Sequence, residues 1–436
     1  MSSDYVCPRC GQAISSAGQP CPSCRPPGRI SLLRSDTFAI ATLLLLAVGL
    51  FAITHFVTRS FERRQDHLAR FWFSKGQGEL SARRAPDAIK SLRTALAYSR
   101  ENFQYRLRLA QALAGTPANT TAAVTNPGSP KPGAGEDQQL RQAQAYLRAL
   151  WEEQPGNGTV NLELARVAAR TGDFNRALRF YHGAIFGVWE DDPEARRRQV
   201  RLELAEYLLD VKAVEQAQSE LIALAADLPR DPALHMQVAR LFVEAGEYRR
   251  ALEQYRAALQ LDPRELTALV GAGEAAFHLE RYRDAQRYLQ RAVSQNPQNQ
   301  RASELLSLVT LVRELDPFAP RLSAQERARR VLFAYERAGH RLAECAETRG
   351  ESLAPSSAAS ADSAAASPAG LHAEYARLRE LRPQMRSSAL VRKPELADAA
   401  MDAVRDVEQH TAGLCGSPTG ADQALLLITS RREREP

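Results

Sequence analysis

Four cysteines near the start of the chain have the spacing of metal ligands. Cys7 and Cys10 flank one Cys-x-x-Cys turn, Cys21 and Cys24 flank another, and ten residues separate the two pairs. Two such turns can present four thiolates in the tetrahedral shell that structural Zn²⁺ prefers. We therefore expect residues 1–30 to hold one structural Zn²⁺, with no position left open for a catalytic water. Two disulfides or four free thiols are the alternative.

This cysteine-rich segment resembles the short zinc ribbon found at the N-terminus of many bacterial membrane and regulatory proteins. The resemblance implies a small folded module that depends on its metal. Between Cys10 and Cys21 the segment has no Lys, Arg or aromatic residue. It therefore offers little to phosphates or to stacked bases, which disfavours nucleic acid as a partner.

An apolar run follows the cysteines and has the length of a membrane span. Residues 37–58 contain no Asp, Glu, Lys or Arg. At about 1.5 Å per residue, a helix over this run covers the roughly 30 Å of a bilayer core. The run is too long for the apolar region of a cleaved signal peptide, and no A-x-A site follows it. We expect one retained transmembrane helix in the cell (inner) membrane of a bacterium, in contact with the lipid bilayer.

The flanks of this span give opposing signals about its orientation. The larger number of positive residues after the span favours a cytoplasmic C-terminal side. Four clustered thiols, however, stay reduced and metal-loaded most easily in the cytosol, and long domains translocate largely regardless of charge. We favour a cytoplasmic N-terminus and an extracytoplasmic body, and the reverse orientation stays open. The flanking cations are Arg25, Arg29 and Arg34 before the span, and Arg59, Arg63, Arg64, Arg70 and Lys75 after it.

The body of the chain repeats with a period of 34 residues. An ordered set of small and large residues recurs three times without a gap: Val214, Ala217, Leu221, Leu224 and Pro229; Tyr248, Ala251, Tyr255, Ala258 and Pro263; Tyr282, Ala285, Leu289, Ala292 and Pro297. This pattern resembles the tetratricopeptide repeat (TPR), a pair of antiparallel helices. The resemblance implies an all-α fold, a TPR α-solenoid, in which small residues let the paired helices approach and proline ends the second helix.

Further copies extend this array over residues 69–315, with insertions. They begin near Trp72, Leu109 and Leu164. About six helix pairs result, followed by a capping helix over 302–315 that shields the last apolar face. An insertion over 115–137, rich in Pro, Gly, Thr and Ala, is expected to be disordered. A second, of about six residues through Trp189 to Pro193, interrupts the array further on.

The remainder of the chain is predicted to contain more helices. A capping box at Ser323 opens an amphipathic helix over 321–350, in which Cys345 reads as a core thiol. A low-complexity linker follows over 351–370. The pattern then predicts C-terminal helices within 371–430, whose role, like the oligomeric state, the sequence leaves open. Arg431, Arg432 and Arg434 read as a solvated tail.

No grouping of residues supports catalysis, so we do not expect an enzyme. The eight His are scattered, and there is no Walker-type loop and no G-x-S-x-G elbow. Gly271 and Gly273 lie inside a repeat helix, where close packing explains them. The formal net charge of +6 is spread over interspersed residues of both signs.

The TPR resemblance implies binding, because the first helix of each pair lines a concave groove in that family. An ordinary solvated helix face is the alternative for each groove position. Leu107 and Leu162 stand where some relatives need a cation to clamp a C-terminal carboxylate, which disfavours that mode of binding. The groove positions map to Arg166, Arg170, Glu206, Asp210, Arg240, Glu244, Glu274 and His278.

Together these features predict a membrane-anchored scaffold or adaptor that binds a protein or peptide partner in its TPR groove. By analogy with other anchored repeat proteins, its setting would be cell-envelope assembly or quality control. The alternative is a nucleic-acid-linked regulator tethered to the membrane, in which the zinc ribbon contacts DNA or RNA and the repeats sense a signal.

Overall fold

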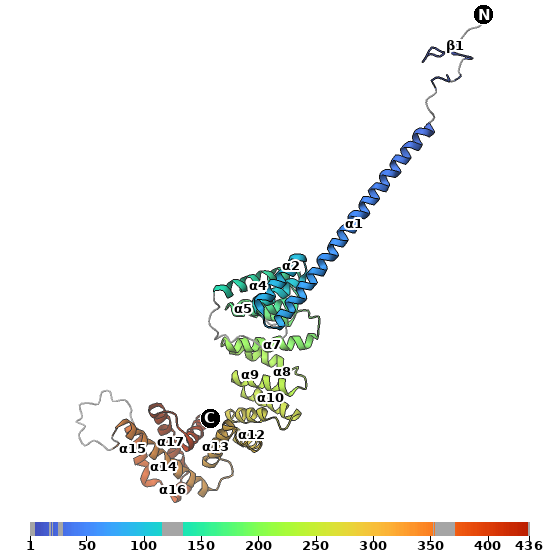
Figure 1. Ribbon diagram of the computed structural model, residues 1–436. Helices are drawn as coiled ribbons and strands as arrows, with labels where there is room; N and C mark the ends of the chain where they lie inside the picture. The colour runs from blue at the N-terminus through green and yellow to red at the C-terminus, as the bar shows by residue number, and fades with distance from the viewer. Residues whose placement is uncertain are drawn as a thin grey trace. The chain divides into compact units, whose positions relative to one another are not determined.

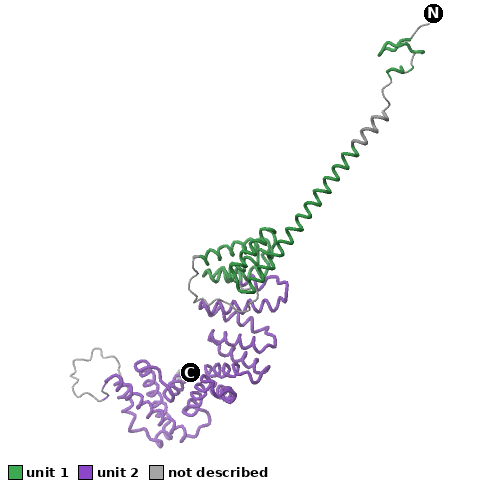
Figure 2. Tube along the Cα trace, in the orientation of Figure 1, with its two compact units in different colours: residues 1–123, 130–180 green, residues 124–129, 181–436 purple. Residues whose placement is uncertain are grey.

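The computed structural model describes residues 5–16, 19, 21–24, 29–115, 134–351, 353 and 371–434. Within them the chain consists almost wholly of helices, with one pair of two-residue strands near the N-terminus (Figure 1). The helical repeats confirm the predicted all-α solenoid class. Two compact units divide the described residues, one ending at residue 180 and the other beginning at residue 181 (Figure 2).

The two units hold the following elements in chain order. The first unit contains β1 (Tyr5–Val6), β2 (Ala13–Ile14), α1 (Arg29–Ser81), α2 (Ala85–Tyr98), α3 (Phe103–Ala114), α4 (Ala134–Glu153), α5 (Gly158–Arg170) and most of α6 (Phe174–Ile185). The second contains α7 (Pro193–Asp210), α8 (Val214–Ala225), α9 (Pro232–Glu244), α10 (Tyr248–Leu261), α11 (Leu266–His278), α12 (Tyr282–Gln295), α13 (Gln300–Leu315), α14 (Ala324–Arg349), α15 (Leu371–Leu381), the 3₁₀ turn η1 (Arg382–Gln384), α16 (Ser387–Arg392), α17 (Pro394–Cys415) and α18 (Gly420–Arg434).

Helix α1 runs without a break for 53 residues. In its apolar part, Leu45, Phe51 and Phe56 expose 71%, 72% and 74% of their surface. By length and composition this helix is able to cross a membrane. It continues through residues 59–68, which contain no proline or glycine to end it, until Ala69 is buried where α1 packs on α2. The segment predicted to span a membrane and the first helix of the array are therefore one helix.

The turn inside each helix pair repeats the same geometry at 34-residue intervals. Lys212, Gly246 and Glu280 adopt left-handed φ angles of 64°, 75° and 58°. The next backbone N–H then reaches back to a carbonyl of the preceding helix, which satisfies one of the acceptors that a helix end leaves free. These bonds run from Ala213 to Leu208, from Glu247 to Phe242 and from Arg281 to Ala276, each at 2.8 Å.

Glycine occurs where two helices of a pair come closest. A Cβ atom added at Gly76 of α1 would lie 2.8 Å from Leu92 Cγ of α2, and one added at Gly273 of α11 would lie 2.7 Å from Leu289 Cγ of α12. Both leucines are fully buried. Packing thus explains Gly273, as the sequence predicts.

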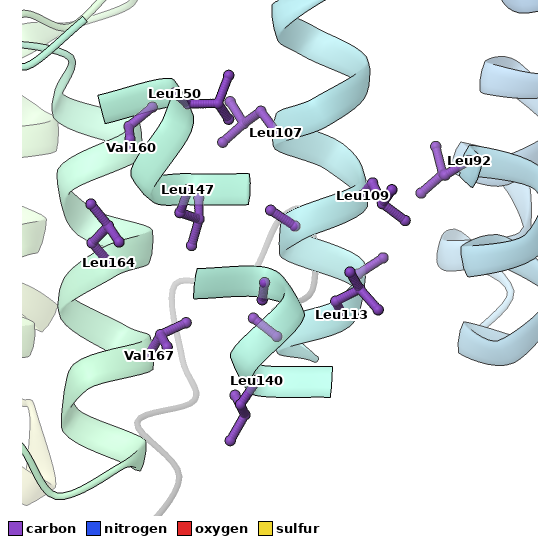
Figure 3. Close-up of a cluster of buried hydrophobic side chains, with 14 of the residues drawn as sticks. Leu92, Leu107, Leu109, Leu113, Leu140, Leu147, Leu150, Val160, Leu164 and Val167 are labelled. Atoms are coloured by element: carbon purple, nitrogen blue, oxygen red, sulfur yellow. The ribbon is translucent and has the colours of Figure 1, made fainter. Parts of the chain in front are cut away.

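The core of the first unit is a layer of aliphatic side chains between successive helices (Figure 3). Leu92 of α2, Leu109 of α3, Leu147 of α4 and Val160 of α5 are all inaccessible to solvent. Leu107 also belongs to this cluster. Helix α4 begins at Ala134, so residues 134–137 of the insertion that was predicted to be disordered are helical instead, and residues 116–133 lie outside the described residues.

The second unit does not end at the predicted capping helix. Helix α13 is itself covered by α18, whose Leu425 and Ile428 are buried. Arg431, predicted to belong to a solvated tail, lies in α18 and its Nε is 3.5 Å from the Glu280 carboxylate. The exposed apolar face of a terminal repeat needs a cover, and this chain supplies it from its own C-terminal helix.

A disulfide joins two helices of the second unit. Cys345 of α14 is bonded to Cys415 at the end of α17 across 70 residues of sequence. The predicted burial of Cys345 is confirmed, at 1% exposed. The sequence leaves open whether Cys345 and Cys415 are separately buried or paired, and the structure joins them. Of the predicted linker over 351–370, the structure describes residues 351 and 353.

Candidate functional site

The four N-terminal cysteines converge on one point. Their Sγ atoms all lie within 4.8 Å of one another, and those of Cys10 and Cys21 are 3.5 Å apart. Strands β1 and β2 pair in antiparallel fashion around the first Cys-x-x-Cys turn, where the Cys7 N–H donates to the Gln12 carbonyl at 2.9 Å. The second turn closes through the Cys24 N–H, which donates to the Cys21 carbonyl at 3.2 Å.

Gly11 follows the first turn with φ +71°, a conformation in which glycine meets no Cβ penalty.

The surroundings of these thiols set their pKa values far apart. Backbone N–H groups of Arg9 and then Cys10 donate to the Cys7 sulfur, and they lower its pKa to about 7. A hydrogen bond with Cys10, followed by burial and the neighbouring thiols, raises the pKa of Cys24 to about 12.

These residues fit a metal ion. Four thiols this close cannot all ionise side by side unless a cation offsets their charges, and a divalent metal does so. The donor set contains four sulfurs and no oxygen or nitrogen ligand, which is the chemistry of a closed structural site. Cys7 and Cys21 are 7% and 8% exposed, so half of the set is already withdrawn from water.

The predicted groove residues of the first unit are held by acceptors of that same unit. Arg166 Nη1 of α5 donates to the Glu163 carboxylate at 3.2 Å. Arg170 pairs with Glu136 of α4 and donates to the carbonyl of Ala114. In the first unit Arg166 therefore bonds within α5, and Arg170 joins α5 to α3 and α4.

In the second unit, three predicted carboxylates gather on α7 and α9. Burial raises the pKa of Glu206, although Gln237 donates to it at 3.2 Å and Arg240 lies near. Burial raises the pKa of Asp210 too, and the charge of Glu244 adds to the effect. Burial is the main cause of both raised pKa values, and the charges of neighbouring acids, Asp210 for Glu206 and Glu244 for Asp210, add to it.

The last two predicted groove residues lie on α11. Arg301 of α13 pairs with Glu274. The His278 ring stacks on Tyr248, with the ring centroids 4.2 Å apart and the planes at 11°. Partial burial lowers the pKa of His278, so this ring is mainly neutral near pH 7.

The structure thus brings six of the eight predicted groove residues together within one unit, while Arg166 and Arg170 belong to the other. Sequence reasoning missed Gln237 and Arg301. Gln237 lies three residues before Arg240, so helical periodicity could have found it. Arg301 belongs to α13, which was predicted only as a cap, and no sequence signal links it to Glu274.

The tetratricopeptide-repeat family matches residues 73–125, 136–186 and 242–309. The matched segments coincide with helix pairs of the structure. The chain contains tetratricopeptide repeats. Between the matched segments, residues 187–241 hold α7 and α8, which pack as a pair in the same way. TPR proteins are protein–protein interaction scaffolds, and the chain is similar to several solved structures.

Three solved structures illustrate that similarity. YrrB, a TPR protein with an unusual peptide-binding site, is 16% identical with a TM-score of 0.35 and covers 49% of this chain and 97% of its own. PilF of Pseudomonas aeruginosa is 17% identical with a TM-score of 0.36, covering 55% and 97%. PilW, a type IV pilus biogenesis factor, is 14% identical with a TM-score of 0.36, covering 55% and 98%. A search of curated proteins finds no match to the chain.

Proposed function

We propose that this chain is a membrane-anchored TPR scaffold that holds a partner protein next to the bilayer of a bacterial cell, in envelope assembly or quality control. The observation that carries the proposal is the continuity of α1. An apolar helix exposed on all sides continues, without a break, into the helix that packs on α2 as part of the first repeat. The rigid helix would fix the start of the array close to the membrane surface.

We further propose that the cysteine cluster binds zinc and lies in the cytoplasm, with the repeats on the other side of the membrane. The disulfide between Cys345 and Cys415 supports this orientation, because disulfides persist in oxidising compartments. The four cysteines of the cluster are free and close enough to share one metal, which suits a reducing compartment.

The partner in the groove would carry basic residues. Arg240 lies near Glu206 and Lys212 near Asp210, and burial, followed by the charges of neighbouring acids, raises the pKa of both carboxyl groups. A Lys or Arg side chain placed among them would supply the missing positive charge and lower both pKa values. Tyr248 of α10 and His278 of α11 offer a stacked flat surface in the same unit.

Photo-crosslinking in membranes tests this proposal. A photoreactive amino acid replaces Gln237, at the centre of the acidic group, in the full chain expressed in a bacterial host. The expected result is a discrete crosslinked protein that is lost in an Asp210→Asn, Glu244→Gln double variant. The matched control is Glu215→Gln, at an exposed position of α8, which should keep the crosslink. Equal crosslinking by the groove variant and the control would contradict the assignment of the groove.

A further inference from the structure

The insertion before α7 alters one repeat of the array. Helix α7 has 18 residues, whereas the corresponding helices α5, α9 and α11 have 13 each. The additional turns lie at its N-terminal end. Arg197 belongs to these additional turns and Arg198 follows it, and both lie beside the end of α6 and the end of α8.

A cavity of about 290 Å³ opens at this place. Its floor includes the apolar side chains of Ile185 and Leu224. Its wall carries three arginines, Arg197, Arg198 and Arg201, against two carboxylates, Glu194 and Asp227. The cavity therefore combines an apolar floor with a wall rich in arginine, although Arg201 also has a carboxylate nearby, that of Glu220, 3.8 Å from its Nε.

The arginines are not fully satisfied by these carboxylates. Arg198 lies 4.0 Å from Asp227, longer than a hydrogen bond, whereas Arg197 pairs with Glu194 at 3.1 Å. Among the described residues, the buried Nε atoms of Arg197 and Arg201 have no hydrogen-bond partner. A buried donor without an acceptor is costly, so an anionic group that enters the cavity would be stabilised there.

The position of these arginines works against the stability of their own helix. Arg196, Arg197 and Arg198 lie in the first two turns of α7, where the helix dipole disfavours cations. The helix dipole therefore gives no reason for the run. An anionic ligand would supply one.

Phe186 lines the cavity, and Val188 follows it two residues along the chain; both apolar side chains are unusually exposed. Phe186 and Val188 are 76% and 74% exposed, and outside α1 no other large apolar side chain among the described residues exceeds 55%. The loop that carries them is fixed, because Trp189 Nε1 donates to the Ala184 carbonyl at 2.9 Å. Fixed apolar groups beside a charged cavity are typical of a protein-binding surface.

We infer that this cavity, together with Phe186 and Val188, is a second docking site, which binds an acidic segment of a partner protein carrying a bulky apolar residue. The carboxylate would enter among the arginines and the apolar side chain would cover Phe186. A flat anionic membrane fits less well, since the side chains of Arg198 and Arg201 are only 24% and 27% exposed and line a cavity.

The chain itself does not supply such a segment. Its internal stretches outside the described residues, 116–133 and 354–370, contain one acidic residue between them, Asp362. The chain as a whole has a net charge of +6, so a second copy offers little charge complementarity. The occupant is therefore another protein.

Binding of a synthetic peptide to the full chain in detergent micelles tests the inference. The probe is a fluorescein-labelled heptapeptide of sequence DEFDLED, followed by fluorescence anisotropy. We expect saturable binding that weakens with added salt. The double variant Arg197→Gln, Arg198→Gln should bind at least about tenfold more weakly, and Phe186→Ser, which changes an exposed side chain, should weaken binding severalfold.

Two control variants show whether the peptide binds at this cavity. Arg196→Gln removes a neighbouring charge that does not line the cavity and should leave binding within about twofold. The groove variant Asp210→Asn, Glu244→Gln should also bind normally. Absence of probe binding, equal binding by all variants, or equal binding of the basic peptide KRFKLRK would overturn the inference. Binding of phosphatidylglycerol vesicles by the chain, lost in Phe186→Ser, would also overturn the inference. That result would assign the surface to the membrane.

Discussion

The chain contains two groups of cysteines, and their surroundings favour opposite chemical states. Near the N-terminus, four free thiols converge within 4.8 Å, and backbone N–H groups lower the pKa of Cys7 to about 7. In the C-terminal helices, Cys345 and Cys415 are joined in a disulfide, with Cys345 buried. Helix α1, which is able to cross a membrane, separates the two groups in sequence.

This contrast teaches that a single chain can use cysteine for metal binding and for covalent cross-linking only if the thiols of one group do not react with the disulfide of the other. Thiolates of the cluster would attack a disulfide in the same compartment, and an oxidant that maintains the disulfide would oxidise the cluster. We propose that the membrane keeps them apart. Each of the following predictions tests one side of the comparison.

The largest effect is expected from loss of one metal ligand. Cys21→Ser removes a nearly buried sulfur of the cluster, and binding of structural zinc is worth about 10–16 kcal/mol in small peptides. We expect the zinc content of the purified chain to fall at least about tenfold, with no change in helical circular dichroism, since the helices do not depend on the cluster. Ser23→Ala is the matched control and should retain zinc.

Loss of the disulfide should produce the next largest effect. The double variant Cys345→Ser, Cys415→Ser releases a loop of 70 residues, which lowers the free energy of unfolding by about 4 kcal/mol in the chain-entropy account. Thermal unfolding of the C-terminal helices measures it. A reducing agent should reproduce the loss in the unmodified protein while leaving the zinc content intact. Equal stability of the oxidised and reduced forms would contradict a structural role.

A pH-dependent effect is expected from Glu408 of α17. This side chain is fully buried, and among the described residues neither carboxylate oxygen has a hydrogen-bond partner. Burial, and then the charge of Asp422, raises the pKa of Glu408 to about 8 from an ordinary value of 4.5. The folded state therefore holds a proton that the unfolded state releases. Stability should fall as the pH rises from about 4.5 to 8, by up to about 1.4 kcal/mol per pH unit.

The substitution Glu408→Gln removes this titration. We expect the variant to be more stable than the original chain at pH 8 and to unfold at a temperature that changes little between pH 5 and pH 8. Glu395→Gln, at an exposed position of the same helix, should keep the original pH dependence. A Glu408 variant with an unchanged pH profile would show that the carboxyl group is not protonated in the folded state.

Several of these features follow from the sequence, because they depend on local spacing. The Cys-x-x-Cys pairs place Cys7, Cys10, Cys21 and Cys24 near one point, and the 34-residue period gives the helix pairs together with their turns at Lys212 and Gly246. The continuity of α1 could have been predicted as well, since residues 59–68 contain nothing that ends a helix.

The features that the sequence did not yield depend on contacts between distant segments. Cys345 and Cys415 lie 70 residues apart, so spacing gives no sign of their bond. Helix α18 contains a short apolar run followed by arginines, a pattern that equally fits a solvated tail. Only the contact with α13 in the structure shows that this helix packs on the array. The burial of Glu408 also depends on contacts between distant segments. From the sequence alone, an acidic residue on a helix is expected to face water.

Reporter fusions test the central claim, that α1 crosses the membrane with the cysteine cluster in the cytoplasm, most directly. An enzyme that is active only in the periplasm is fused after Pro436 in one strain and before Met1 in another. The account predicts activity only from the fusion after Pro436, with zinc retained in both proteins. Activity only from the fusion before Met1 would contradict it, and would place the repeats and their disulfide in the cytoplasm.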